Sequence, residues 1–125
     1  MSAEHRRLQG LFGRLMRAPK VRFPEDRKRL DAPSGRGVYV IYGPRGRPMH
    51  VGGTPRAKKG IAQRLRNHLA GQSSFVNQYL DGQPFRLRGK YQFQCLEVPN
   101  SRLRALLEAY AIGQLCPAHN GHGLE

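Results

Sequence analysis

Tyr39 and His50 belong to two short segments whose residue types could support acid–base chemistry. Residues 37–42 read GVYVIY and residues 49–52 read MHVG, and a turn containing Gly and Pro separates them. Strand periodicity places each of the two rings on the side opposite its aliphatic neighbours, so paired strands would put both on one less apolar face. The simpler alternatives are a core aromatic for Tyr39 and an exposed strand residue for His50.

Arg64, His68 and Glu108 are the other side chains that could act on a charged substrate. Arg64 and His68 are four residues apart, so a helix would project them from one side. Glu108 is the only acidic residue in the stretch 99–123, on a predicted helix whose exposed side is otherwise basic. The simpler alternatives are a solvated cation for Arg64 and an ion pair with Arg104 for Glu108.

The elements that must position these residues alternate between helical and extended patterns. Apolar periodicity and the Gly and Pro breaks predict an α+β fold: a small three-stranded antiparallel sheet flanked by helices, with an N-terminal amphipathic helix. We expect residues 1–30 to form that basic helix and a connector, and residues 31–125 to form the main domain. The expected helices are 7–18, 60–70, 73–80 and 102–115, the strands are 37–42, 49–52 and 91–98, and the loop is 81–89.

The charge indicates a polyanionic partner. The 125 residues include 22 Lys and Arg against 8 Asp and Glu, a net charge of +14. No acidic residue occurs from 32 to 80, and phosphate backbones bind such a surface through counterion release. A solvated basic face and an anionic membrane surface are the alternatives. The cations expected to contact nucleic acid are Arg36, Arg45, Arg47, Arg56, Lys58, Lys59 and Arg66.

Other function classes fit the composition poorly. No apolar stretch approaches the roughly 20 residues of a transmembrane helix, and the N-terminus lacks the apolar core of a secretory signal. Two cysteines, Cys95 and Cys116, are too few for a disulfide-stapled scaffold. We therefore expect an intracellular, cytoplasmic protein in a reducing compartment, without a membrane partner.

The ordered set of motifs resembles the GIY-YIG nuclease family over residues 37–120. The set consists of GVY at 37–39, HVG at 50–52, Arg64 with His68, Glu108, and Asn120 after a proline turn. The resemblance implies a metal-dependent endonuclease, a phosphodiester hydrolase acting on DNA, with residues 31–125 as its catalytic domain. It also implies a three-stranded antiparallel sheet flanked by helices. DNA is the expected partner, RNA stays open, and a homodimer would cut both strands.

The resemblance also implies roles for single residues. Tyr39 would act as general base or orienter of the attacking water, and Arg64 would steady the charged transition state. His68 would assist by hydrogen bonding, Glu108 would hold one Mg²⁺ or Mn²⁺ ion, and Asn120 would help to organise the site. Because a tyrosine with a pKa near 10 is a poor base at pH 7, we expect nearby cations to lower the pKa of Tyr39.

Three departures from the family pattern keep a second reading open. His50 replaces the second tyrosine; it can make the same hydrogen bonds and could itself take a proton near neutral pH. The segment 51–64 is longer than the compact pattern, and its extra residues are basic. We also expect no separate recognition domain, so residues 1–30 and the loops would have to select the target. The second reading is a catalytically inactive nucleic-acid-binding module on the same fold.

A competing metal site involves the last part of the sequence. Cys116, His119 and His122, with Cys95 as a fourth ligand, would suit structural Zn²⁺ by ligand type. Their spacing matches no familiar zinc module, and Cys95 fits an alternating strand as a small buried residue. We therefore expect His119 and His122 to be tail residues, with His119 near enough to Asn120 to touch phosphate.

Overall fold

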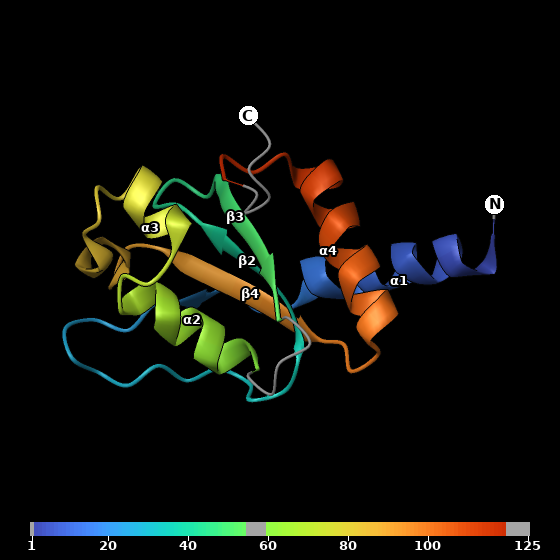
Figure 1. The fold of residues 1–125 in the computed structure, drawn as a ribbon, viewed down its shortest axis with the longest axis horizontal. Helices are drawn as coiled ribbons and strands as arrows, with labels where there is room; N and C mark the ends of the chain where they lie inside the picture. The colour runs from blue at the N-terminus through green and yellow to red at the C-terminus, as the bar shows by residue number, and fades with distance from the viewer. Residues whose placement is uncertain (1, 55–59, 120–125) are drawn as a thin grey trace.

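Four antiparallel strands form one sheet in the computed structural model, which describes residues 2–54 and 60–119 (Figure 1). The strand order is β1-β4-β2-β3, so β3 is an edge strand and β2 lies inside the sheet. Tyr39 on β2 pairs with Gly52 on β3 and with Cys95 on β4. The strands are β1 Val21–Arg22, β2 Gly37–Tyr42, β3 Pro48–Gly53 and β4 Gln92–Glu97.

The sequence predicted a three-stranded sheet, but the described sheet has a fourth strand, β1. Strands β2, β3 and β4 form where the alternation predicts them, but β1 lies in the segment expected to be a connector. Val21 pairs with Phe93 and Arg22 pairs with Gln92. Two residues are too few to show a period of two, so only the neighbouring strand reveals β1.

The predicted helices all form, and capping side chains mark the starts of α1, α3 and α4. Ser2 accepts a hydrogen bond from His5 N, and Asn100 accepts one from Leu103 N. The Ser2 cap lets α1 begin four residues earlier than expected. The helices are α1 Ala3–Arg17, α2 Ile61–Leu69, α3 Ser74–Tyr79 and α4 Ser101–Leu115; the expected loop 81–89 contains a 3₁₀ helix, η1, at Pro84–Leu87.

Apolar side chains cover both faces of the sheet. On one face Tyr39 and Ile41 pack with Phe75 and other residues of α2 and α3. On the other face Val38 and Val40 pack with residues of α1 and α4 (Figure 1). The face that carries Tyr39 is therefore a full core rather than the less apolar face expected, because α2 and α3 cover it.

One buried amide links the N-terminal helix to the sheet. Gln94 on β4 is 1% exposed, accepts from the Tyr42 hydroxyl and donates to Ala18 O at 2.9 Å. Ala18 caps the C-terminal end of α1, so this contact fixes where that helix meets the sheet. No helix in the described ranges is long and apolar enough to cross a membrane.

Candidate active site

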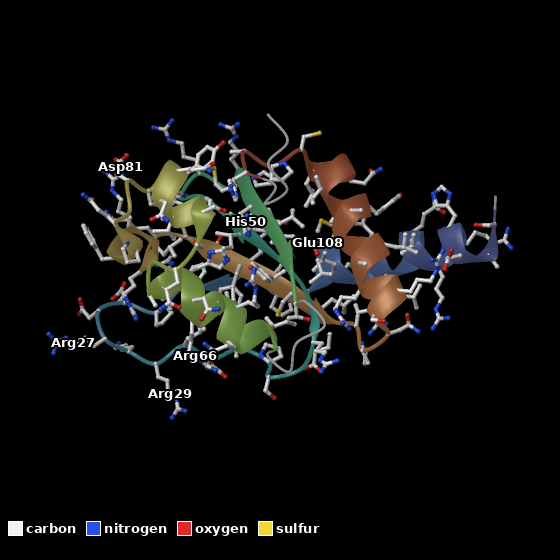
Figure 2. The ribbon with its side chains drawn as sticks, viewed as in Figure 1. Arg27, Arg29, His50, Arg66, Asp81 and Glu108 are labelled. Carbon is white, nitrogen blue, oxygen red and sulfur yellow. The ribbon has the colours of Figure 1, made fainter. Side chains whose placement is uncertain are left out.

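Two adjacent glycines on β3 bring together side chains from both faces of the sheet. A Cβ on Gly52 would overlap the Tyr39 hydroxyl and would lie 3.0 Å from His50 Nε2. A Cβ on Gly53 would lie 2.5 Å from Glu108 Oε1. Successive strand residues face opposite sides, so Tyr39 and Glu108 approach the edge strand from different layers. Figure 2 shows His50 and Glu108 on either side of β3.

Tyr39 is fully buried and its hydroxyl lies 2.8 Å from His68 Nε2. Burial raises the pKa of Tyr39 to about 12; the charge and hydrogen bonding of Arg64 oppose this rise, and the charge of Glu108 adds to it. Arg64 acts in the direction expected of a nearby cation, but desolvation of the phenolate outweighs it, so the pKa is raised overall. Tyr39 keeps its proton at neutral pH, and its hydroxyl is hydrogen bonded to His68.

His68 is a buried, neutral histidine on α2. Burial lowers the pKa of His68 to about 3, and the charges of Arg64 and His119 act in the same direction. Its Nδ1 lies 2.8 Å from the hydroxyl of Ser73, which also accepts from Val76 N as the N-cap of α3. A neutral imidazole has one N–H, so one ring nitrogen of His68 donates and the other accepts in its bonds to Tyr39 and Ser73.

His50 is buried rather than exposed on its strand. Its ring stacks on Phe75 with centroids 5.3 Å apart and an interplanar angle of 17°. Burial lowers the pKa of His50 well below its ordinary value, and His68 and His119 reinforce this. His119 is itself held against β3, because its backbone N donates to Met49 O at 2.8 Å and Ala118 N donates to Pro48 O at 3.3 Å.

Arg64 supplies a buried hydrogen-bond donor. Among the described residues, its Nε is the buried side-chain nitrogen or oxygen that lacks a hydrogen-bond partner. Arg64 lines a cavity of about 200 Å³ together with His50, Asn67, His68 and Ser73. A buried guanidinium nitrogen without a partner is costly, and an anionic oxygen would satisfy it.

Glu108 fits a hard divalent cation by the chemistry of its donor atoms. Its carboxylate occupies the space that a side chain at Gly53 would fill, and it borders an open cavity of about 460 Å³ lined also by Thr54 and Ser101. Within residues 2–54 and 60–119 no three His, Cys, Asp or Glu side chains are grouped to hold a metal. A single carboxylate still suits Mg²⁺ or Mn²⁺, which retain several waters and bind phosphate oxygens.

Arg104 is buried, although the sequence predicted a basic exposed side for its helix. It is 3% exposed, and its guanidinium donates to Thr54 O at 3.1 Å and to Val98 O and Pro99 O at 3.0 Å. Arg104 therefore ties the end of β3 to the start of α4, one helical turn before Glu108. Arg102 remains on the surface and pairs with Glu4 at 2.8 Å.

The other predicted residues divide into three groups. Asn120 and the cations Arg56, Lys58 and Lys59 lie outside the described residues. Arg36, Arg45, Arg47 and Arg66 are exposed, and Arg66 projects from α2 on the side away from Arg64, because two helical residues span about 200°. Of the alternative zinc ligands, Cys95 packs against the core and Cys116 is exposed, while His122 lies outside the described residues.

Three contact residues were missed at the level of the sequence. Ser73 and Ser74 follow Gly71 and precede an apolar helix, which is the pattern of an N-cap and gives no hint of contact with His68 or His119. His119 was expected in the tail, yet it is 9% exposed and hydrogen bonds to His50 across 69 positions of sequence. Only the docking of residues 118–119 on β3 reveals this contact.

The described residues offer two kinds of group to a charged ligand. Arg64 has a donor for an anionic oxygen and lines one cavity with His50 and His68, and Glu108 has a carboxylate that borders another cavity. Models of known protein families give no match to this sequence, and curated proteins give none either.

Proposed function

We propose that this protein is a divalent-metal-dependent endonuclease of the GIY-YIG type, which hydrolyses phosphodiester bonds of DNA. The observation that carries the proposal is the convergence of Tyr39, Arg64 and Glu108 on the edge strand β3. Arg64 and Glu108 both shift the pKa of the same tyrosine, in opposite directions, so all three groups lie within short electrostatic range.

Each residue has a definite part in such a hydrolysis. Glu108 would hold Mg²⁺ or Mn²⁺, which when bound supplies positive charge at the phosphoryl oxygens and at the leaving oxygen. The Arg64 Nε–H, which is unpartnered within the described residues, donates to a non-bridging oxygen as negative charge develops there. The Tyr39 oxygen, fixed by its bond to His68, orients the attacking water by accepting a hydrogen bond from it.

The surface supports a nucleic-acid substrate. The net charge is +14, and the exposed cations on α2, on the β2–β3 turn and before β2 are available to phosphates. Electrostatic contacts of this kind position a duplex without reading its sequence. The cations proposed for this role are Arg36, Arg45, Arg47 and Arg66, together with Arg56, Lys58 and Lys59 of the basic segment.

The first prediction concerns Glu108 and tests the proposal directly. Purified protein should convert supercoiled plasmid to nicked or linear DNA with Mg²⁺ or Mn²⁺, and should not do so with EDTA. Glu108→Ala should abolish cleavage while retaining or strengthening DNA binding, because the change removes a metal ligand and a negative charge. Asp81→Asn is the matched control: it removes an exposed acid whose partner is Arg86, and should leave cleavage unchanged.

The competing function is an inactive nucleic-acid-binding module, favoured by the histidine at position 50 and by the raised pKa of Tyr39. It predicts tight, salt-sensitive binding without cleavage of plasmid, single-stranded DNA, branched DNA or RNA by either protein. Normal cleavage by the Glu108→Ala variant would instead show that the metal is bound elsewhere.

A further inference from the structure

The hydrogen bonds of His50 fix which of its ring nitrogens carries the proton. Its Nδ1 lies 2.9 Å from His119 Nδ1 and 3.2 Å from the backbone carbonyl oxygen of His119. A carbonyl oxygen can only accept, so His50 Nδ1 must be the protonated nitrogen that donates to it. A neutral imidazole has one N–H, and therefore His50 Nε2 carries a lone pair.

His119 and Ser74 complete a directed chain of hydrogen bonds. Since His50 Nδ1–H is the donor, His119 Nδ1 accepts, and the proton of the His119 ring lies on Nε2. That Nε2 is 3.1 Å from the Ser74 hydroxyl, which accepts from it at the first residue of α3. This series of hydrogen bonds runs from His50 on β3 through His119 to Ser74 on α3. The tautomer of each ring follows from that of the ring before it.

The unprotonated nitrogen lies at the centre of the candidate active site. His50 Nε2 and the Tyr39 hydroxyl both approach the point that a side chain at Gly52 would occupy. Tyr39 is poorly suited to accept a proton there, because the oxygen of a neutral phenol is a far weaker base than an imidazole lone pair, and this hydroxyl is already hydrogen bonded to His68. The groups that surround His50 are Arg64 and His68 on α2, Tyr39 on β2, Phe75 on α3 and His119.

We infer that His50 Nε2, rather than Tyr39, accepts the proton of the attacking water, and that His119 and Ser74 are positioning residues that hold His50 in the required tautomer. The inference rests on the proposed nuclease function. The water oxygen forms the new bond to phosphorus while the bond from phosphorus to the leaving ester oxygen breaks. The water proton passes to His50 Nε2, and the leaving oxygen takes its proton from solvent.

The arrangement explains how histidine can serve at the position where the family pattern has tyrosine. The carbonyl oxygen of His119 holds Nδ1 of His50, so the ring cannot turn Nδ1 toward water. Nε2, with its lone pair, therefore stays on the side of Gly52. The negative charge of a bound phosphodiester would favour the protonated ring and so strengthen the base as the substrate arrives.

The test combines ring ¹⁵N NMR of the labelled, metal-free protein with plasmid cleavage. At pH 7 the spectrum should show His50 protonated on Nδ1 and unprotonated on Nε2, a result that does not depend on activity. His50→Asn retains a donor near the position of Nδ1 but lacks Nε2, and should lower kcat by about 10²-fold or more while plasmid binding persists. His5→Asn, an exposed histidine on α1, is the matched control and should cut normally.

Variants at position 119 show whether His119 positions the His50 ring or only stabilises the fold. His119→Ala removes the ring acceptor and should lower kcat by about tenfold at unchanged KM, with a larger fraction of His50 protonated on Nε2. His119→Asn places an amide oxygen near the former position of Nδ1 and should restore both the tautomer and the rate.

The possible failures are distinguishable. A wild-type chain that cuts DNA but has His50 protonated on Nε2, or whose His50→Asn variant cuts at the normal rate, overturns this inference and leaves the nuclease intact. A wild-type chain that cuts no substrate with either metal overturns the proposed function, and the role of His50 as base with it.

Discussion

Arg64 has a buried donor that lowers the stability of the fold and that is proposed to bind an anionic oxygen of the substrate. Its Nε is buried within the described part of the chain without a hydrogen-bond partner, beside a cavity of about 200 Å³. A buried unpaired donor destabilises a fold by about 1–3 kcal/mol, so an anion that accepts from it would bind with an advantage the free protein lacks. At the scale of single residues, this is the position where binding of phosphate is expected to stabilise the protein.

The second prediction is that Arg64→Met lowers the cleavage rate by about 10²–10³-fold, the usual cost of losing one donor to a transition-state oxygen. Methionine keeps much of the apolar volume of the side chain. Single-turnover cleavage of a labelled duplex measures the rate, and Arg66→Met, on the solvent side of the same helix, should stay within a few-fold of the wild type. Equal losses in both variants would mean that Arg64 contributes only general charge.

The third prediction concerns acid stability and depends on His68. Its pKa is about 3 in the folded protein, whereas the unfolded chain binds the proton near pH 6.5. On acidification the unfolded state therefore gains the proton first, and stability is lost as the pH falls from about 6.5 toward 3. His68 alone should reduce the free energy of unfolding by about 2 kcal/mol between pH 7.5 and pH 5.

Urea denaturation at the two pH values measures this effect. His68→Gln should reduce the difference between pH 7.5 and pH 5 by that amount, although the variant is less stable at both. An unchanged pH dependence in the variant would show that His68 is not buried in its neutral form.

At the scale of elements, Arg104 joins the end of β3 to the start of α4. Three backbone carbonyls accept from its guanidinium, and the helix it anchors carries Glu108 one turn later. The fourth prediction is that Arg104→Met lowers the free energy of unfolding by about 3 kcal/mol or more, because those carbonyls lose their donor in a buried place. Urea denaturation measures the loss, and Arg102→Met, at an exposed ion pair, should change stability little. Equal effects of the two changes would contradict this role.

The sequence predicts most of the elements because their patterns are strong. The apolar run at 37–42 and the alternation at 91–98 identify β2 and β4, and Asn100 before the last helix identifies its start. The strand β1 and the 3₁₀ helix η1 were missed because neither is long enough to repeat its own pattern. Their positions depend on contacts with distant residues, as in the pairing of Val21 with Phe93.

The candidate site was predictable in part. Spacing alone placed Arg64 and His68 on one side of a helix and Tyr39 and His50 on one face of a hairpin, and the structure brings these four together. Local pattern does not encode burial by other elements, and so the sequence indicated the effect of the cations on the Tyr39 pKa but not the larger, opposite effect of burial. For the same reason, the inward turn of Arg104 and the contact of His119 with His50 could not be foreseen.

At the scale of the whole molecule, the net charge of +14 sets the fifth prediction. Binding of a short labelled duplex, measured by fluorescence anisotropy, should weaken by about 10³-fold or more between 50 and 200 mM salt if six or more phosphates are contacted. A double variant, Arg45→Gln with Arg47→Gln, should reduce the slope of log Kd against log salt by about 0.9 for each phosphate that the variant no longer neutralises. A change of less than tenfold over this range would argue against phosphate binding as the main source of affinity.

The docking of residues 118–119 on β3 also bears on self-association. An edge strand exposes backbone groups that can pair with the strand of another molecule, and β3 is such an edge. Ala118 N donates to Pro48 O and His119 N donates to Met49 O, so part of that edge is already hydrogen bonded within the chain. Detachment of this short segment would offer those carbonyls to a neighbouring molecule, and the contact that orders the site therefore also guards the protein against edge-to-edge aggregation.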